Sequence, residues 1–335
     1  MQGKREARIK MPWKCYELEY KAKSAIHIGY GTQLGIVSRT RYYIPGKTVW
    51  GAVTAALSRR IMENYDAEIY RKIGEFVKHH LIFGYFYPLK EGDVLYPNYT
   101  EEGFGYGNKV GGEFVMTKEE FEKEFISSYI STALDKNSMT AEEGSLHEFE
   151  LISPVEFVGY LFTNLEKGQG SAIYGLPIFV KEVSNDEIRV EIKGKEIEVF
   201  EAIREIQVGG ERIYGFGKLE LTGIEEKEDM VSLYGSEMVV NLKGTSTPII
   251  SVSGEPDSGY LSLAHVNIQN QGFTGIGIRG DIEPLVGREW DNERGKGAGQ
   301  KISDVKICLT PGTRFSLKEG EEIRVGDFGI WEFLR

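Results

Sequence analysis

The sequence is poor in cysteine and in long apolar runs. Its 335 residues include two cysteines, Cys15 and Cys308, which disfavours a disulfide scaffold and a cysteine-based zinc site. No apolar run approaches the roughly 18 residues that a membrane helix needs. The basic N-terminal stretch also lacks the apolar segment of a secretory signal. We therefore expect a cytoplasmic protein that is not embedded in a membrane.

Positive charge is also in short supply. The net charge is −11, from 40 basic and 51 acidic residues. A protein that coats nucleic acid without selectivity carries the opposite excess, so this balance disfavours wide nonspecific binding. The basic residues nevertheless cluster, so the net charge does not exclude a localised basic groove that binds nucleic acid. The clusters are Lys4, Arg5, Arg8 and Lys10; Arg39, Arg41 and Lys47; Arg59 and Arg60; and Arg288, Arg294, Lys296 and Lys301.

The familiar catalytic and cofactor motifs are missing. The histidines do not have a helical metal spacing, and no serine-hydrolase elbow or dinucleotide-binding glycine pattern occurs. The stretch "YYIPGKTVWGAVTAAL" contains Gly46-Lys47-Thr48, but a phosphate loop needs a further glycine where Arg41 stands. We therefore expect no nucleotide hydrolysis, no metal and no cofactor. The helix start after the Pro-Gly turn can still attract another anion.

The hydrophobic pattern predicts strands and one clear helix. Apolar and polar residues alternate over 16–28, which predicts a half-buried strand. Residues 45–61 keep the apolar spacing of a helix. Residues 187–200 predict a hairpin through Lys193-Gly194-Lys195, followed by a short helix over 198–206.

The character of the sequence changes near residue 225. Residues 1–225 predict one domain, with an insertion at about 64–126 that carries exposed, aromatic and glycine-rich loops. Residues 226–335 contain many short β-like runs and a long polar loop over 287–301, and predict a β-rich C-terminal lobe.

Two features suggest chemistry on RNA. His27 lies in the polar phase of the first predicted strand, just before a glycine loop, and could act as general acid or base on a phosphodiester, or could only contact a neighbour. The segment "YGFGKLEL" (214–221) combines glycines, aromatic rings and Lys218. Glycines allow close backbone approach, rings stack on bases and lysine meets phosphate, although a tight hairpin with core aromatics gives the same pattern.

Together these segments resemble the CRISPR-associated RAMP superfamily (repeat-associated mysterious proteins), which supplies subunits of RNA-guided effector complexes. Four stretches carry the resemblance, in the order of the family and within residues 14–221. They are "AIHIGYG", "YYIPGKTVWGAVTAAL", "ALDKNSMTAEEGSLHEFELI" (133–152) and "GGERIYGFGKLEL".

The resemblance implies an α+β fold. It implies a ferredoxin-like, RRM-related β-α-β-β-α-β core with insertions that grip guide RNA, and a protruding hairpin or loop at 133–148. The C-terminal lobe looks like the second half of larger, two-lobed subunits, and a second, degenerate ferredoxin-like domain is one interpretation of it. The resemblance makes Lys47 and Lys218 contacts to the RNA backbone. With the basic clusters and the glycine loop, the candidate RNA-binding residues are Arg39, Arg41, Lys47, Thr48, Lys136, Tyr214, Phe216, Lys218, Arg288, Arg294 and Lys296.

One departure from the family bears on function. In the repeating backbone subunit of type III complexes, an aspartate in the loop after the first strand cuts target RNA. The matching stretch here, 29–40, contains no Asp or Glu. The leading hypothesis is therefore a noncatalytic guide-RNA-binding subunit of a type III effector, with guide RNA and other RAMP subunits as partners. Two alternatives stay open. One is a metal-independent endoribonuclease that processes precursor CRISPR RNA through His27, and the other is a carbohydrate-binding β protein.

Overall fold

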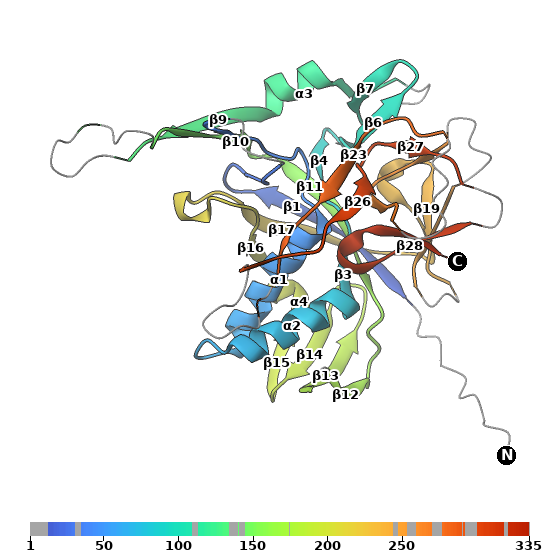
Figure 1. Ribbon diagram of the computed structural model, residues 1–335. Coiled ribbons are helices and arrows are strands. Elements are labelled where there is room, and N and C mark those ends of the chain that lie inside the picture. The colour runs from blue at the N-terminus through green and yellow to red at the C-terminus, as the bar shows by residue number, and fades with distance from the viewer. Residues whose placement is uncertain are drawn as a thin grey trace.

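The fold is α+β, as the sequence predicts, with short helices packed on several sheets (Figure 1). No helix among the described residues is long and apolar enough to cross a membrane. The computed structural model describes residues 13–30, 35–108, 113–133, 140, 145–173, 175–243, 247–252, 259–269, 277–289, 291, 300–317 and 321–334.

A first sheet is centred on β1 (Lys14–Ala22). β1 pairs antiparallel with β11 (Glu156–Thr163) on one side and with β17 (Lys218–Lys227) on the other. The sheet continues from β11 to β3 (Leu81–Phe83), β4 (Tyr87–Lys90) and β5 (Asp93–Val94), and from β17 to β16 (Glu205–Gln207). The order along the sheet is therefore β16-β17-β1-β11-β4-β5.

Helices and a smaller sheet cover one face of the first sheet. The predicted helix is confirmed as α1 (Gly46–Ile61), which packs beside α2 (Ala67–His80) and near α4 (Val199–Ala202). These helices share one apolar core with Tyr16, Leu18 and Tyr20 of β1. The same core receives a four-stranded sheet of β12 (Gly170–Ile173), β13 (Leu176–Val183), β14 (Ile188–Ile192) and β15 (Lys195–Glu198).

The predicted hairpin between β14 and β15 is confirmed. Its turn residues Lys193 and Gly194 have φ values of 53° and 76°. Positive φ at both positions is the geometry of a two-residue type I′ turn, whose twist matches that of the paired strands.

The C-terminal lobe covers the opposite face of the first sheet. It holds an eight-stranded sheet. In sheet order its strands are β18 (Met230–Ser232), β19 (Met238–Asn241), β20 (Ile249–Val252), β28 (Glu322–Val325), β29 (Trp331–Leu334), β22 (Val266–Asn267), β26 (Lys306–Leu309) and β23 (Ile282–Leu285). Two short ladders accompany it, β21 (Tyr260–Leu261) with β27 (Arg314–Phe315) and β24 (Arg288–Glu289) with β25 (Lys301–Ile302).

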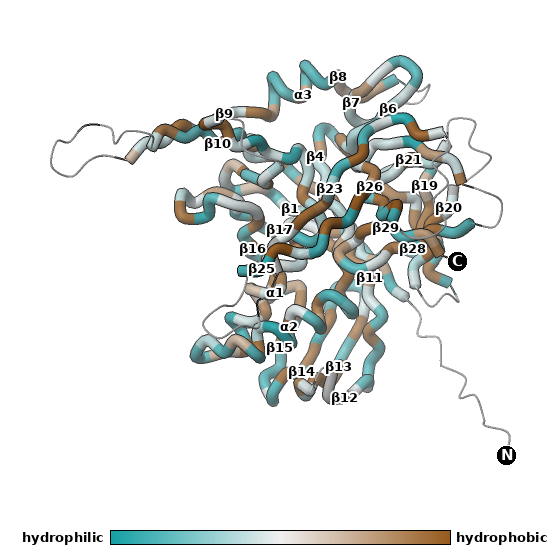
Figure 2. Tube along the Cα trace, in the orientation of Figure 1, coloured by the Kyte–Doolittle hydropathy of each residue, from teal (hydrophilic) through white to brown (hydrophobic). Residues whose placement is uncertain are grey.

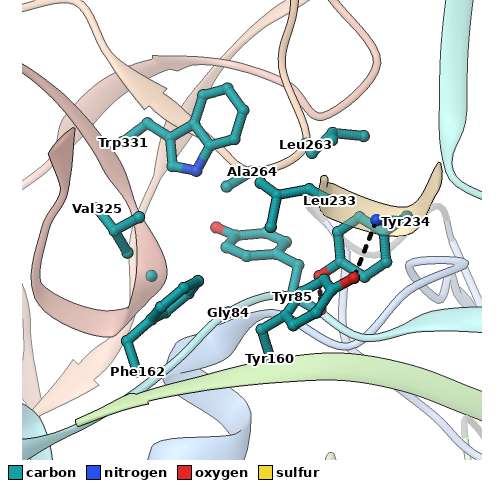
Figure 3. Close-up of a pocket in the computed structure, with 11 residues that line it drawn as sticks. Gly84, Tyr85, Tyr160, Phe162, Leu233, Tyr234, Leu263, Ala264, Val325 and Trp331 are labelled. Atoms are coloured by element: carbon teal, nitrogen blue, oxygen red, sulfur yellow. Dashed lines mark hydrogen bonds between the residues drawn. The ribbon is translucent and has the colours of Figure 1, made fainter. Parts of the chain in front are cut away.

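A second apolar core joins this lobe to the first sheet. Tyr85 and Tyr160 from the first sheet region meet Tyr234 and Trp331 from the C-terminal lobe (Figure 3). The backbone N–H of Tyr234 donates to Tyr160 Oη at 3.1 Å. Because the lobes share this core, the predicted division near residue 225 stays a prediction. The described residues place the change of sheet between Lys227 and Met230.

The aromatic stretch 82–87, expected in exposed loops, is buried instead. Ile82 and Phe83 belong to β3, Tyr87 belongs to β4, and both strands pair with β11 in the first sheet. The sheet is covered on both faces, so β3 and β11 carry buried residues on both sides, whereas β1 alternates from Tyr16 to Ala22. Within the expected insertion at 64–126, the part up to Lys90 therefore forms α2 and two sheet strands.

A two-stranded arm projects from the body. β9 (Ile126–Ser131) and β10 (His147–Ile152) pair antiparallel, and β2 (Val37–Ser38) runs parallel to β10. This hairpin, at the upper left of Figure 1, has the position that the resemblance implied for 133–148, although 134–139 and 141–144 lie outside the described residues. β6 (Pro97–Thr100), β7 (Gly103–Tyr106) and β8 (Met116–Thr117) form a three-stranded sheet, and α3 (Lys118–Phe125) leads directly into β9.

Candidate nucleic-acid interface

The predicted glycine loop, residues 208–217, is hydrogen-bonded to the end of the first strand. Its short helical turn is η1 (Arg212–Tyr214). The N–H of Gly210 donates to the carbonyl of His27 at 2.9 Å, and the N–H of Gly217 donates to the carbonyl of Ala25 at 2.8 Å. The loop and the strand end therefore form one continuous surface.

Two glycines make this close approach feasible. Gly209 has φ 77°, and a Cβ there would lie 2.1 Å from the His27 carbonyl oxygen. Gly217 has φ 81°, and its Cβ would lie 1.9 Å from the Val208 carbonyl oxygen. Both positions need positive φ and the absence of a side chain, which glycine alone supplies. The glycine-rich pattern in the sequence is thus explained by backbone packing.

His27 lies beneath the loop rather than on the surface. Its side chain is 6% exposed, and its Nδ1 lies 2.8 Å from the carbonyl oxygen of Glu150 in the arm. A carbonyl only accepts, so Nδ1 carries the proton in this contact. The ring also meets Phe149 edge-on at 5.7 Å between centroids. His27 thus joins the first strand, the glycine loop and the arm.

Aromatic side chains gather where the glycine loop meets the arm. Tyr214 lies 5.7 Å from Tyr129 of β9 and 6.0 Å from Phe149 of β10, centroid to centroid. Phe216 meets Tyr129 edge-on at 5.5 Å, and His147 meets Phe149 at 4.9 Å. We call Tyr129, His147, Phe149, Tyr214 and Phe216 the aromatic platform.

The platform presents apolar surface to solvent. Tyr214 is 43% exposed and Tyr129 is 41% exposed. Ile213 and Ile130 beside them are exposed at 94% and 62%. Figure 2 shows that apolar residues continue outward into the β9–β10 arm, away from the two cores. An exposed aromatic surface of this kind can stack with bases of any sequence.

Two candidate cations are exposed, Lys218 next to the glycine loop and Arg39 beside Tyr30. Lys218 is exposed at the start of β17, and its backbone N–H donates to Ser24 Oγ at 3.0 Å. Arg39 is exposed, and its guanidinium lies 5.4 Å from the ring centroid of Tyr30. The backbone of Arg39 pairs with Tyr30, just beyond the first strand. Both side chains are therefore accessible to a phosphate.

Arg41 is engaged between the two lobes. Its side chain is 10% exposed, and its Nη1 and Nη2 lie 2.7 and 3.2 Å from the carboxylate oxygens of Glu283. Glu283 also accepts a hydrogen bond from His265 Nε2. Burial by itself raises the pKa of Glu283, but the hydrogen bonds from His265 and Arg41 lower it to about 2. The fixed counter-charge holds Arg41 within the protein.

Lys47 and Thr48 lie at the start of α1, in contact with η3 (Asp327–Gly329). A Cβ at Gly46 would lie 2.3 Å from the carbonyl oxygens of both Phe83 and Phe328. Lys47 Nζ lies 5.2 Å from the ring centroid of Phe328. Carbonyl oxygens repel a phosphate, so the side of the helix start that Gly46 occupies is closed to one.

The remaining candidates have less structural detail. Arg288 lies in β24, where the backbone alone is described. Lys136, Arg294 and Lys296 lie outside the described residues. Among the residues that the structure does describe, no group of three or more His, Cys, Asp or Glu side chains could hold a metal ion.

The structure therefore unites Tyr214, Phe216, Lys218 and His27, and adds Tyr129 and Phe149, which the sequence did not reveal as candidates. Tyr129 lies in "ISSYIS" (β9) and Phe149 lies in "HEFELI" (β10). The alternation of polar and apolar residues in "HEFELI" is a strand signal, but the pairing that brings both rings beside the glycine loop depends on register between distant segments.

Comparison with known proteins identifies the family. No curated protein matches the chain. A cryo-EM structure of the type III-B Cmr-beta bound to cognate target RNA and AMPPnP is similar, with 10% identity, coverage of 89% of this chain and 84% of the other, and a TM-score of 0.49. A second, bound to cognate target RNA, has 11% identity, coverage of 89% and 85%, and a TM-score of 0.49. A third, in the apo state, has 11% identity, coverage of 62% and 96%, and a TM-score of 0.37. The family description RAMP superfamily matches residues 19–220, a span that begins within β1 and contains α1, the arm and the glycine loop, and the chain belongs to that superfamily.

Proposed function

We propose that this chain is a noncatalytic guide-RNA-binding subunit of a type III CRISPR effector complex. The observation that carries the proposal is the aromatic platform, in which the glycine loop of a RAMP protein packs against a projecting arm. Stacking on such rings, with the exposed Lys218 next to the glycine loop, suits a single strand whose bases are exposed.

The connectivity of the first lobe supports a ferredoxin-like, RRM-related core. Its strands lie in the order β17-β1-β11-β4, with α1 between β1 and β4 in sequence and α4 between β11 and β17. That is a β-α-β-β-α-β arrangement with all neighbours antiparallel. The described residues after Lys227 contain strands and 3-10 turns but no α-helix, so we confine this part of the proposal to the first lobe.

Two features support a noncatalytic role. The loop after the first strand, 29–40, has no carboxylate that could act on target RNA. His27, the candidate acid or base, is 6% exposed and donates from Nδ1 to the Glu150 carbonyl. A general acid or base must come within hydrogen-bond reach of the reacting group, whereas His27 is placed to hold the loop and the arm together.

The proposed partners are guide RNA and other RAMP subunits. Rings that stack on bases and lysines that contact phosphates do not recognise sequence. In RNA-guided systems, base pairing between guide and target supplies the sequence specificity. The platform therefore needs to hold the guide in place rather than to recognise its bases.

The test is binding of guide-type single-stranded RNA, followed by fluorescence anisotropy, to the purified chain and to the chain with its neighbouring subunits. We expect saturable binding and intact RNA after incubation in EDTA. Failure to bind in both settings would overturn the proposal. Cleavage in EDTA that disappears in His27→Ala would instead establish the endoribonuclease. Binding of oligosaccharide without RNA would establish the carbohydrate-binding protein.

A further inference from the structure

A second aromatic site lies apart from the platform, in a pocket between the lobes. The pocket has a volume of about 380 Å³ and is lined from four parts of the chain. Tyr30 and Arg39 come from the first strand end, Tyr99 and Phe104 from β6 and β7, Glu122 from α3, and Asp281 from the C-terminal lobe. This volume falls within the range of roughly 300–1,000 Å³ typical of small-molecule sites. We call it the interlobe pocket.

The walls of the pocket are built in advance. Tyr99 and Phe104 lie 4.6 Å apart, and Phe104 meets Tyr106 edge-on at 5.3 Å, centroid to centroid. Tyr106 stacks on Phe121 at 4.1 Å, and Tyr42 stacks on the same ring at 5.5 Å. Rings that support one another lose little entropy when a flat ligand enters, because they are already ordered.

Carboxylates supply the polar contacts inside these walls. Tyr99 Oη donates to Asp281 Oδ2 at 2.5 Å. Glu122 Oε1 lies 3.2 Å from Tyr42 Oη and 3.8 Å from Lys118 Nζ. An ionised carboxylate accepts through two oxygens and several lone pairs, so each retains capacity for a donor on a ligand. The pocket therefore favours a flat ring that carries N–H groups.

Three basic residues line the pocket, Arg39, Arg41 and Lys118, and Lys118 Nζ lies 3.8 Å from Glu122 Oε1. Arg41 lines the pocket, but Glu283 neutralises it. Arg39 is exposed beside Tyr30, so its guanidinium can contact the phosphate of a nucleotide whose base occupies the pocket. Aromatic walls, carboxylates and an exposed cation match a nucleotide. Guanine presents adjacent N–H donors on its pairing edge, whereas uracil presents a single N–H between two carbonyls that carboxylates repel.

We propose that the interlobe pocket binds one unstacked nucleobase of the bound RNA and prefers guanine to uracil. The assignment of this base to bound RNA rests on the proposed function. The pocket is distinct in kind from the platform, because the platform stacks bases of any identity and the pocket discriminates by hydrogen bonding.

The test uses the full chain with GMP and UMP, followed by saturation-transfer NMR of each nucleotide, and with single-stranded RNAs that contain or lack guanine. The variant is Glu122→Gln with Asp281→Asn, which keeps the size and shape of both side chains. We expect transfer to GMP but not to UMP, and loss of the GMP signal in the double variant. We expect the double variant to bind guanine-containing RNA about 5- to 150-fold more weakly, the range of a bidentate base contact, and to bind oligouridine unchanged.

Phe104→Ala is a second variant that removes a wall without altering charge, and it should also abolish the GMP signal. Thermal melting checks that each variant is folded. Tyr65→Ala, an exposed tyrosine between α1 and α2, is the matched control and should leave GMP binding unchanged.

Four results would overturn the inference. They are equal transfer to GMP and UMP, a GMP signal that survives in both folded pocket variants, a GMP signal lost in Tyr214→Ala instead, and displacement of GMP by a neutral oligosaccharide. If RNA binds but GMP does not, the pocket inference fails and the proposed function stands. If GMP binds in the pocket but no RNA binds, the proposed function fails and the site for a nucleobase stands.

Discussion

The ring of Tyr214 in the glycine loop lies 5.7 Å from the ring of Tyr129 in the arm, centroid to centroid. This contact joins two segments that the family match includes but that lie in different sheets. It places an exposed aromatic surface between the arm and the body.

Replacing Tyr214 with alanine should weaken binding of single-stranded RNA. Stacking on an aromatic ring is worth about 1–3 kcal/mol per base, so we expect affinity to fall about 5- to 150-fold. Fluorescence anisotropy measures the change. Tyr65→Ala, which removes a 69% exposed ring elsewhere, is the control. Equal affinity of the Tyr214 variant and the parent would show that the platform does not hold RNA.

Replacing Lys218 with alanine should reduce the salt dependence of binding. Each phosphate contact to a single strand contributes about 0.7 to the slope of log affinity against log salt, so the slope should become less steep by about that amount. Titrations at several salt concentrations give the slope. Lys195→Ala, at the β14–β15 hairpin where Lys195 pairs with Glu63, should leave it unchanged. A slope unaltered in the Lys218 variant would contradict a phosphate contact.

Replacing Gly217 with alanine should destabilise the glycine loop far more than the same change at Gly215. Both residues have positive φ, 81° and 86°, but a Cβ at 217 meets the Val208 carbonyl at 1.9 Å whereas a Cβ at 215 meets nothing within 4 Å. Strained φ alone costs of order 1–3 kcal/mol, and the steric clash adds to it at 217. Chemical denaturation of both variants measures the difference. Similar losses would mean that the loop relaxes away from the Val208 carbonyl.

Replacing Glu283 with glutamine should strongly destabilise the protein. The change leaves Arg41, whose side chain is 10% exposed, without its counter-charge, and breaking a buried pair from one side costs about 3–5 kcal/mol. Chemical denaturation gives the free energy of unfolding. Glu220→Gln removes a carboxylate from an exposed pair with Lys23 and should have little effect. A small loss for Glu283→Gln would show that water reaches Arg41.

Stability should decrease as the pH falls below about 6.5, in part through His265. Burial lowers the pKa of His265, against an opposing hydrogen bond with Glu283, and Tyr85 Oη lies 2.5 Å from its Nδ1. The unfolded chain therefore binds a proton at a higher pH than the folded one, and acid favours unfolding. One such group contributes at most about 1.4 kcal/mol per pH unit. Urea melts from pH 7 to pH 5 should show this slope, and His265→Gln should reduce it; an unchanged slope would assign the effect to other groups.

Local sequence signals predicted the elements whose bonds are local. The helix over 45–61 and the hairpin turn at Lys193-Gly194 follow from spacing and turn chemistry, and both are present. The strand predicted over 16–28 ends earlier, at Ala22. Beyond it, the N–H of Lys23 donates to the carbonyl of Lys218 and the carbonyl of Ala25 accepts from Gly217. The hydrogen-bond partners of Lys23 and Ala25 therefore come from the distant glycine loop and the start of β17. Alternation of apolar and polar residues within one segment does not predict such partners.

The candidate site shows the same division. Glycines, rings and Lys218 in the glycine loop were visible as a pattern in the sequence. The roles of Arg41 and His27 were not, because each is determined by a partner far away in the chain, Glu283 for Arg41 and the Glu150 carbonyl for His27. Sequence identified the chemical groups, and tertiary pairing decides which of them face solvent.

The packing of Gly46 beneath the carbonyl of Phe328 also bears on how the chain folds. These residues are separated by most of the sequence, so their contact closes a very long loop. Closing such a loop carries an entropic cost, and folding slows as contacts become less local. Phe83 of the first lobe closes one side of Gly46 and Phe328 of η3 closes another. We therefore expect packing at the start of α1 to be completed only when the C-terminal lobe folds.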